Sequence, residues 1–452
     1  MHYRRASPIF RVALLICLCA FAVGPLIMKA YSNASNSLNN SDAPSLSTSE
    51  LLWEKTYGGP GDDRAFCAVP TANNGFLIVG SSTSFIPGKT TAWIVRVDSD
   101  GTMVWNKTYQ ENDGTEFRNA LKTTDGFLLV GNTFSQSGDE DAWIVRIDDQ
   151  GNVLWNKTIG GEKLDKIFSA ASAPDGFVFV GLTDSFGNGG SDGWVIKTDM
   201  DGKLLWNKTF GGSGDDAFRS IIVTNNHYLI AGYTDSNGNG NYGFWFVKTD
   251  ENGTLLWSKT YGGPESNKAY ALTGAEDGYI IVGDTHSTEK TDVDALIVKT
   301  DLDGKLLWTK TYGGDNFDEA STVIRARNGG YVIAGFTFSY GKGQRDIWIF
   351  KIDDFGNNVW SRVYGREAFE ETYSVVEMGD NEFVAGGWTN SIGSGSYDYY
   401  AVRMKLAASS EFAARDLGYY VLAFLGSTAV VLLGCLYFQL KRQKGKTNCR
   451  VG

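Results

Sequence analysis

Residues 205–217 read LWNKTFGGSGDDA, and close relatives of this stretch recur along most of the chain. Each copy opens with a tryptophan, and successive tryptophans lie 52, 50, 51, 51, 51 and 52 residues apart. They are Trp53, Trp105, Trp155, Trp206, Trp257, Trp308 and Trp360. Self-similarity at a period of about 50 residues is typical of solenoids and propellers. This repeat therefore decides the fold class before any single motif is considered.

One period contains four short β-rich runs. In the fourth copy these are residues 217–224, 227–234, 244–250 and 254–261, and Asn- or Gly-rich turns separate them. Four short strands per period match the four-stranded blade of a propeller. We therefore predict an all-β, seven-bladed β-propeller over residues 51–405.

The two ends of the repeat body complement each other. The body begins with an isolated fourth-strand run, residues 51–57, and it ends with a third-strand run, residues 399–405, that no fourth run follows. Six blades are complete, and the leftover pieces together make a seventh. A ring closed in this way leaves no blade edge exposed. We predict that the N-terminal strand pairs with the last three strands.

The segments outside the body differ from it in composition. Residues 1–30 have a basic start and an apolar run, typical of a signal peptide or an N-terminal anchor, and residues 31–50 form a Ser/Asn-rich linker. Residues 406–416 form a stalk, and residues 417–440 are 24 uncharged residues, enough for a transmembrane helix. The basic tail, residues 441–452, is then cytoplasmic by the positive-inside rule, and the body is extracellular.

The body is strongly acidic. Residues 51–405 hold 31 Lys and Arg against 48 Asp and Glu, in a chain whose net charge is −11. Such a surface repels nucleic acid, whose binding depends on phosphate contacts. Of the five cysteines only Cys67 lies in the body, so we expect no disulfide there. No Cys/His spacing typical of a zinc site occurs either.

The loops that precede the first strand of each blade carry an acid or an amide at one repeated place. In a propeller these loops open on one face, and the first strands line the central channel. We therefore predict a ring at the channel mouth that binds a cation, with calcium as the candidate, or a basic ligand. In the alternative interpretation each side chain caps N–H groups of its own Gly-rich loop. The ring consists of Asp63, Glu116, Asp165, Asp216, Asn267, Asp318 and Glu370.

Two further repeated features are interpreted structurally. A glycine recurs in the second strand of every blade and indicates a bulge or a close backbone approach: Gly80, Gly131, Gly181, Gly232, Gly283, Gly335 and Gly387. The D-x-D-G turn before each fourth strand resembles part of a calcium loop. Lysines stand where that loop needs oxygen ligands, however, so we predict a hairpin turn. Candidate glycosylation sites are Asn33, Asn39 and Asn252.

The repeat W-x-K-T-[YF]-G-G-x-x-x-D, followed by D-G-[FY]-x-[ILV]-x-G-x-T-x-S and W-[IV]-x-[KR]-x-D-x-x-G, resembles the propeller-type tandem repeats of archaeal and bacterial surface proteins. That resemblance implies the fold and a cell-surface location, but no particular activity. The hairpin that ends in tryptophan is also partially similar to quinoprotein-type propeller repeats. Quinoproteins typically have eight blades and a vicinal cysteine pair, and this chain has seven copies and one body cysteine.

We therefore predict a membrane-anchored extracellular propeller that acts as a binding, adhesion or scaffold module. Its partner would be a surface protein or a glycan, and no cofactor is expected apart from calcium. The alternative is a surface hydrolase or lyase that uses acidic residues at the channel mouth, because paired carboxylates can do acid–base work.

Overall fold

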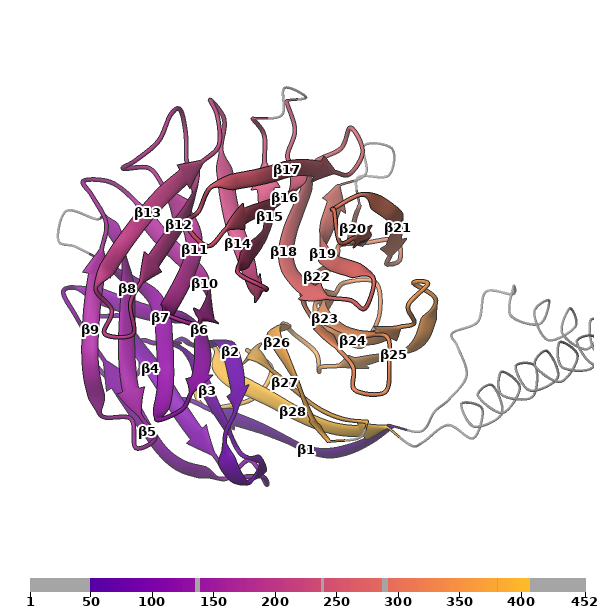
Figure 1. Cartoon of the computed structure of the whole chain (residues 1–452). Coiled ribbons are helices and arrows are strands. Elements are labelled where there is room, and N and C mark those ends of the chain that lie inside the picture. The colour runs from indigo at the N-terminus through magenta and orange to yellow at the C-terminus, as the bar shows by residue number, and fades with distance from the viewer. Residues whose placement is uncertain (1–48, 135–138, 237–239, 287–291, 380, 407–452) are drawn as a thin grey trace, which may run out of the picture. The chain divides into compact units, whose positions relative to one another are not determined.

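Short antiparallel strands build every blade of the protein. The computed structural model describes residues 49–134, 139–236, 240–286, 292–379 and 381–406. Each blade is a four-stranded sheet whose first strand is innermost and whose last strand is outermost, and together the blades form a ring around a central channel (Figure 1). The seven sheets confirm the predicted all-β, seven-bladed propeller.

The first six blades use consecutive strands, and a short 3-10 turn, Ala72–Asn74, interrupts the first. The strands are β2 (Asp63–Pro70), β3 (Phe76–Ser82), β4 (Thr91–Val97) and β5 (Met103–Tyr109) in blade 1; β6 (Gly114–Thr123), β7 (Gly126–Phe134), β8 (Glu140–Asp148) and β9 (Val153–Ile159) in blade 2; β10 (Asp165–Ala173), β11 (Gly176–Thr183), β12 (Asp192–Thr198) and β13 (Leu204–Phe210) in blade 3; β14 (Asp216–Thr224), β15 (His227–Thr234), β16 (Gly243–Asp250) and β17 (Leu255–Tyr261) in blade 4; β18 (Asn267–Gly274), β19 (Gly278–His286), β20 (Val293–Asp301) and β21 (Leu306–Tyr312) in blade 5; and β22 (Asp318–Arg325), β23 (Tyr331–Thr337), β24 (Asp346–Ile352) and β25 (Asn358–Tyr364) in blade 6.

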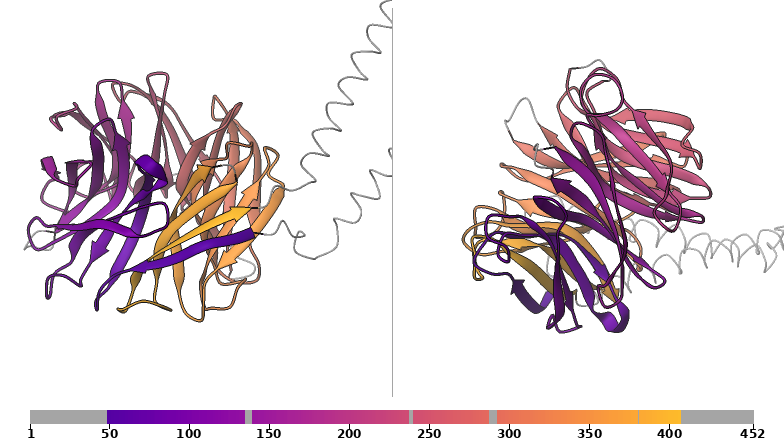
Figure 2. Two further views of the ribbon diagram at one scale, coloured as in Figure 1. Left: turned by 90° about the horizontal axis from the view of Figure 1, so that it is seen from below. Right: turned by 90° about the vertical axis from the view of Figure 1, so that its left-hand side faces the viewer.

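Blade 7 combines both ends of the body. It contains β26 (Glu370–Gly379), β27 (Glu382–Thr389), β28 (Asp398–Leu406) and, as its outermost strand, β1 (Ser49–Tyr57). The first and last strands pair antiparallel, from Ser49 opposite Leu406 to Tyr57 opposite Tyr399. Figures 1 and 2 show indigo β1 running beside yellow β28. The predicted ring closure is confirmed, and the strand begins two residues before the predicted start of the body.

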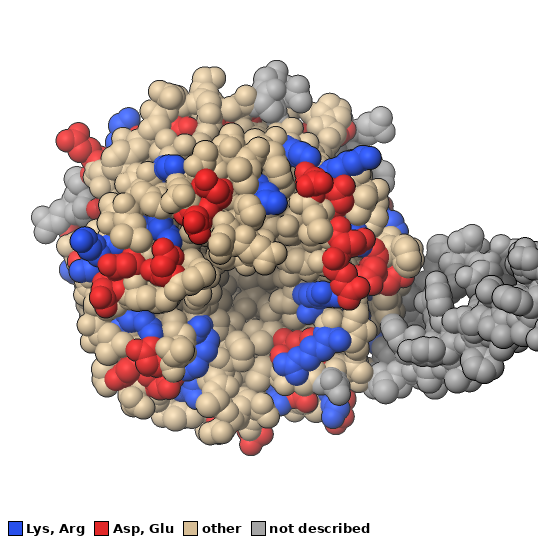
Figure 3. All heavy atoms as spheres, viewed as in Figure 1, with Lys and Arg blue, Asp and Glu red and all other residues tan. Residues whose placement is uncertain are grey.

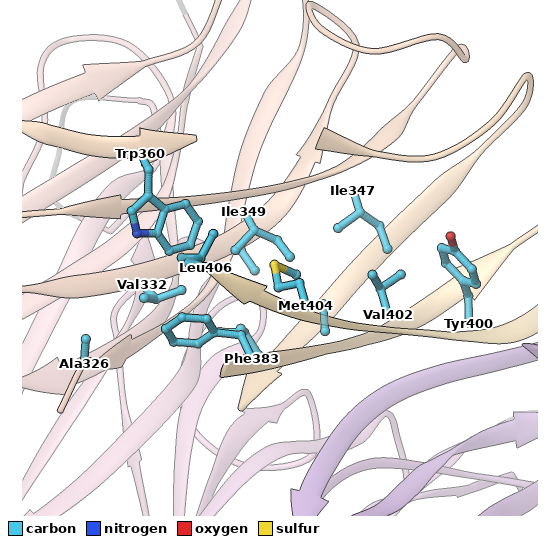
Figure 4. Close-up of a cluster of buried hydrophobic side chains, with 13 residues drawn as sticks. Ala326, Val332, Ile347, Ile349, Trp360, Phe383, Tyr400, Val402, Met404 and Leu406 are labelled. Atoms are coloured by element: carbon cyan, nitrogen blue, oxygen red, sulfur yellow. The ribbon is translucent and has the colours of Figure 1, made fainter. Parts of the chain in front are cut away.

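The hydrophobic core lies between neighbouring blades. Figure 4 shows one such seam, where Ile347, Ile349 and Trp360 of blade 6 face Val402 and Met404 of blade 7. These side chains are all almost inaccessible to solvent. Because each sheet is twisted, its two faces pack against the sheets before and after it, as in other propellers. Each blade therefore depends on both neighbours for the burial of its apolar side chains.

The repeated tryptophans pack across these seams, as their position in every copy suggests. Trp206 of β13 is half-buried, and a Cβ built on Gly253 of the next blade would lie 2.7 Å from its ring. Gly253 lies in the turn after β16 and has φ of +71°, so it has the conformation expected of a hairpin turn. Asn252, a predicted glycosylation candidate, is exposed in that same turn.

The repeated glycines of the second strands allow the first strands to bulge. Each first strand contains one extra residue, for example Arg219 between Phe218 and Ser220 in β14. A Cβ on Gly232, opposite this bulge, would overlap the carbonyl oxygen of Ala217 and would lie 2.8 Å from Phe218 Cα. The same overlap with a first-strand carbonyl occurs at the equivalent glycine of all seven blades. This close approach confirms the structural interpretation of the glycines.

Several predicted segments lie outside the described residues. They are the signal or anchor segment, almost all of the linker, the stalk, the predicted span 417–440, the basic tail, and the candidate glycosylation sites Asn33 and Asn39. Within the residues that the structure does describe, no helix has the length and apolarity needed to cross a membrane.

The glycine contact yields a stability prediction. Replacing Gly232 by alanine should lower the free energy of unfolding by roughly 1–3 kcal/mol or more, because the added Cβ meets backbone atoms that cannot move aside easily. Gly274→Ala is the matched control, since a Cβ there meets nothing within 4 Å. Thermal unfolding of the three proteins measures the difference. Equal midpoints for both variants would contradict the close-approach argument.

Candidate functional site

The predicted acidic ring is buried. Six of its seven residues begin the innermost strand of their blade, and Glu116 is the third residue of β6. Their exposed fractions range from 0% to 7%, and all of them except Glu116 turn into the seams between blades. The structure therefore places the ring around the channel but not at its open surface.

The ring residues form hydrogen bonds with their own blade. Asp216 shows the arrangement: its Oδ2 accepts a hydrogen bond from Gly212 N–H at 2.8 Å and another from the Ser236 hydroxyl at 2.7 Å. Asp63, Asp165 and Asp318 repeat this pattern with equivalent partners. These are the contacts of the capping role. No group of three or more His, Cys, Asp or Glu side chains within the described ranges is placed to hold a metal ion. A cation site at the ring stays a prediction.

Two members of the ring depart from this pattern. The amide of Asn267 donates a hydrogen bond to the carbonyl of Glu265 at 2.6 Å. Glu370 accepts hydrogen bonds from Arg366 N–H at 2.9 Å and from the Thr389 hydroxyl at 2.6 Å. Both still bond within their own blade, so the local role of this position tolerates a longer acid or an amide.

Glu116 does not belong to this ring. In β6 Thr115 lies opposite Thr133, as Asp63 lies opposite Ser82 in β2, so Thr115 occupies the ring position and Glu116 the next one. Thr115 fills the role with its hydroxyl, which donates to Tyr109 O at 2.8 Å. A signal was available in the sequence, because the ring residue always follows the last residue of the preceding outer strand by six positions.

Five seams contain a pair of carboxyl groups. The ring acid of one blade faces an aspartate at or near the start of the third strand of the preceding blade, and a glycine separates them. A Cβ on that glycine would come within 3.1 Å of both carboxyl groups, at Gly58, Gly160, Gly211, Gly313 and Gly365. The pairs are Asp63 with Asp398, Asp165 with Asp141, Asp216 with Asp192, Asp318 with Asp294, and Glu370 with Asp346.

These pairs perturb acidity. Burial, and then the charge of the ring acid, raise the pKa of Asp141, Asp192, Asp346 and Asp398 above the usual range. Two carboxylates this close repel each other when both are ionised, so one of them is more basic than a free carboxyl group. The pKa of these aspartates is raised in the folded protein. Their contribution to the free energy of unfolding is therefore fully present below the unfolded pKa, roughly 4, and it is lost as the pH rises through the folded pKa and the aspartates ionise.

The pairs therefore predict an unusual pH dependence. Asp192→Asn should raise the thermal midpoint at pH 7 by about 2 °C, on the order of 1 kcal/mol, because the amide removes the repulsion and its oxygen can still accept the Asn188 N–H bond. Near pH 4 the variant and the natural protein should have equal midpoints. Asp201→Asn, at an exposed turn, is the control and should change neither value. A lower midpoint for Asp192→Asn at pH 7 would contradict the repulsion.

The residues that line the channel occupy two other positions of the innermost strands. One lies directly after the ring position, and we call this set the upper ring: Arg64, Glu116, Lys166, Ala217, Lys268, Glu319 and Glu371. The other is the bulged residue, and we call this set the girdle: Phe66, Arg118, Phe168, Arg219, Tyr270, Ser321 and Tyr373. Neither set repeats from blade to blade.

Contacts across the blades show that the girdle residues share one space. Arg118 of blade 2 lies over the Phe66 ring of blade 1 at 4.1 Å, and Phe66 contacts Tyr373 of blade 7 at 5.8 Å. The Arg219 guanidinium of blade 4 lies 4.0 Å from the Phe168 ring centre. Burial and Glu319 raise the pKa of Tyr373, against the charges of Arg345, Arg118 and Arg219. Blades 2, 4, 6 and 7 therefore meet in this one region.

A cavity of about 610 Å³ opens beside blades 7, 1 and 2. Its wall contains two ion pairs, Arg118 with Glu116 at 2.6 Å and Arg345 with Glu371. Arg64 completes the wall, where its guanidinium lies 4.3 Å from the Tyr397 ring centre. Figure 3 shows the ring face on, with a hollow at its centre and charges of both signs around it. A cavity of this volume suits a small polar ligand or one end of a larger one.

Glu319 is a carboxyl group of the channel whose pKa is raised. Burial, and then the nearby carboxylate of Asp284, raise its pKa to about 7, although Ser321, Arg219 and Arg345 act in the opposite direction. The Ser321 hydroxyl donates to Glu319 at 2.9 Å. A buried carboxyl group with a raised pKa beside a second carboxylate is typical of a general acid or of a group that exchanges a proton on binding.

The chain is similar in sequence to one known family. A family model described as outer membrane protein assembly factor BamB matches residues 140–384. No curated protein matches the chain.

Several solved structures resemble the chain at low identity. A protein of unknown function from Dyadobacter fermentans has 13% identity and a TM-score of 0.48, over 79% of this chain and 99% of that one. Sqt1 from Chaetomium thermophilum has 10% identity and a TM-score of 0.45, over 80% of this chain and 100% of that one. An alpha-L-arabinanase from Penicillium chrysogenum, complexed with arabinobiose, has 11% identity and a TM-score of 0.46, over 79% of this chain and 98% of that one. At this level none of them assigns a function to the chain.

Proposed function

Since the chain belongs to the propeller family of outer membrane protein assembly factor BamB, we propose that it is a binding module whose ligand enters the central channel. The family description names an assembly factor, which is a binding role. One observation carries the proposal: positions that repeat in every copy build the blades, whereas neither the upper ring nor the girdle has one residue type in all seven blades. An asymmetric wall of charged and aromatic side chains is what selective recognition needs.

The ligand would be a glycan or part of a surface protein. The cavity offers guanidinium donors, carboxylate acceptors and aromatic faces within one space, and it is open to solvent. Arg64 supports this role, because its Nε is buried without a hydrogen-bond partner and its nearest carboxylate, Asp62, is 3.9 Å away. A ligand group could supply the missing acceptor.

Blocking the cavity tests this proposal. Thr90 lines the cavity, and none of the hydrogen bonds described within the chain uses its side chain, so Thr90→Trp should fill the space without unfolding the protein. The full chain in lipid nanodiscs would be screened on an array of glycans and peptides. We expect Thr90→Trp to lose at least tenfold in affinity for whatever the natural protein binds. The control is Thr102→Trp, an exposed turn residue on the opposite face. Equal affinities for both variants would refute binding at the cavity.

The location of the module is the second part of the proposal. A single C-terminal span, residues 417–440, would hold the body outside the cell membrane and leave the basic tail in the cytoplasm. This part depends on sequence alone: 24 uncharged residues are followed by Lys441 and Arg442.

Cysteine labelling tests the orientation. A membrane-impermeant maleimide should label Asp201→Cys on intact cells, and it should reach Cys449 only after permeabilisation. Cys67 should contribute little background, because burial raises the pKa of its thiol to about 11 and the thiolate is the reactive form. Labelling of Cys449 on intact cells would contradict the proposed orientation.

Catalysis by channel carboxylates is the alternative, and the raised pKa of Glu319 favours it. In that case Glu319 would act as a general acid in a hydrolase or lyase. Incubating bound ligands with the natural protein and with Glu319→Gln separates the two functions. Turnover that falls at least a hundredfold in the variant, together with activity that falls as the pH rises above about 7 in the natural protein, would establish the enzyme.

A further inference from the structure

We propose that the girdle binds the carboxylate of an acidic saccharide, with Arg219 as its principal donor. This inference rests on the proposed function, because it takes the channel as the ligand site. It adds the chemical class of the ligand, which nothing above assigns. Three features of the channel favour this ligand class: the order of side chains in the girdle, the stacked guanidinium of Arg219, and the nearby acceptors.

The girdle alternates aromatic and cationic residues over most of its circumference. Going around the ring from blade 1, it reads Phe66, Arg118, Phe168, Arg219, Tyr270, Ser321 and Tyr373. Each arginine therefore stands between two aromatic residues. Guanidinium groups stack on aromatic faces and keep their N–H bonds directed outward from the edge of the plane. The alternation thus holds two planar cations by their faces; Arg118 also donates from Nε to Glu116 at 2.6 Å, whereas, among the described residues, Arg219 is held by stacking alone.

Arg219 is held in this way and has no partner for its donors. Its guanidinium lies 4.0 Å from the Phe168 ring centre and 5.5 Å from that of Tyr270. Within the part of the chain that the structure describes, it makes no hydrogen bond and no ion pair. A guanidinium carries five N–H donors that match a carboxylate in a two-pronged geometry. The charge of Arg219 acts on the Glu319 carboxyl group without a hydrogen bond between them, so the donors of this half-buried cation are open to the carboxylate of a ligand.

The acceptors around Arg219 suit hydroxyl groups. Asp284 of blade 5 is 2% exposed, and it accepts a hydrogen bond from the Tyr270 hydroxyl at 3.0 Å through Oδ2. Its Oδ1 is buried without a hydrogen-bond partner. Glu319, in the upper ring of blade 6, lies two positions before Ser321, the one small side chain of the girdle, and the charges of Asp284 and Arg219 act on it. A sugar ring could lie against the aromatic residues, direct its carboxylate to Arg219 and donate its hydroxyls to these acids.

The charge of the channel favours a carboxylate over a phosphate. Asp284, Glu319 and Glu371 surround the arginines, and they would repel a dianion more strongly than a monoanion. The body as a whole is acidic, so long-range attraction does not bring an anion to the channel. Recognition must then come from short contacts inside the channel, and its affinity should change little with salt concentration.

Calorimetric titration of the full chain in nanodiscs tests this inference. The probes are D-galacturonate, its neutral counterpart D-galactose, and inorganic phosphate, all at constant ionic strength. We expect galacturonate to bind at least tenfold more tightly than either of the others. Arg219→Gln should weaken galacturonate binding at least tenfold, and Arg219→Lys should weaken it less because the charge remains. Arg327→Gln, an exposed arginine outside the channel, is the matched control and should not alter binding.

The outcomes separate this inference from the proposed function. If galactose binds as tightly as galacturonate, and Arg219→Gln changes neither while Thr90→Trp abolishes both, the channel binds saccharides but the carboxylate site is refuted. If phosphate binds most tightly, the ligand class is wrong. If galacturonate does not bind at all, this inference is refuted, and the array screen decides the proposed function separately. Unfolding midpoints of each variant are measured first, and Arg219→Lys serves if Arg219→Gln does not fold.

Discussion

Every blade depends on one close approach between backbones. The glycine of the second strand lies against the carbonyl group that precedes the bulge of the first strand, and a side chain there would overlap that oxygen. The residue inserted by the bulge faces the channel, together with the residue two positions before it on the innermost strand. The wall of the candidate site is therefore a consequence of a contact that serves the stability of the blade.

Much of the fold was predictable because its information is repeated. Seven tryptophans, seven glycines and the mismatched ends of the body indicate the number of blades and the closing strand, and the pairing of β1 with β28 agrees. The hairpin turns were also predictable, since Gly253 and its equivalents have positive φ. A residue that recurs in every copy is required by the structure of the blade. The fold follows from these repeated requirements, so the sequence reveals it.

The candidate site was less predictable, because the residues of the channel wall do not recur in every copy. The repeated acids were the predicted site, and the structure shows most of them buried and hydrogen-bonded within their own blades, while a cation site there stays a prediction. The channel wall uses positions that vary, such as Arg219 and Tyr270, and variation in a single sequence cannot be distinguished from drift. The register within a single blade adds a second difficulty. Glu116 shows this: counting six residues from the end of the preceding outer strand places Thr115 at the ring position and Glu116 at the next one, which faces the channel.

The pairing of Ser49 with Leu406 means that the segments flanking the body leave it as neighbours. A mechanical load that pulls these two segments apart acts first on the terminal residue pair of β1 and β28. It would then break the hydrogen bonds between the two strands one pair after another. A load between a ligand in the channel and both flanks together is different, because it is shared along the full length of β1 and β28. The body should thus resist tension toward whatever it holds and yield to tension between its own two ends.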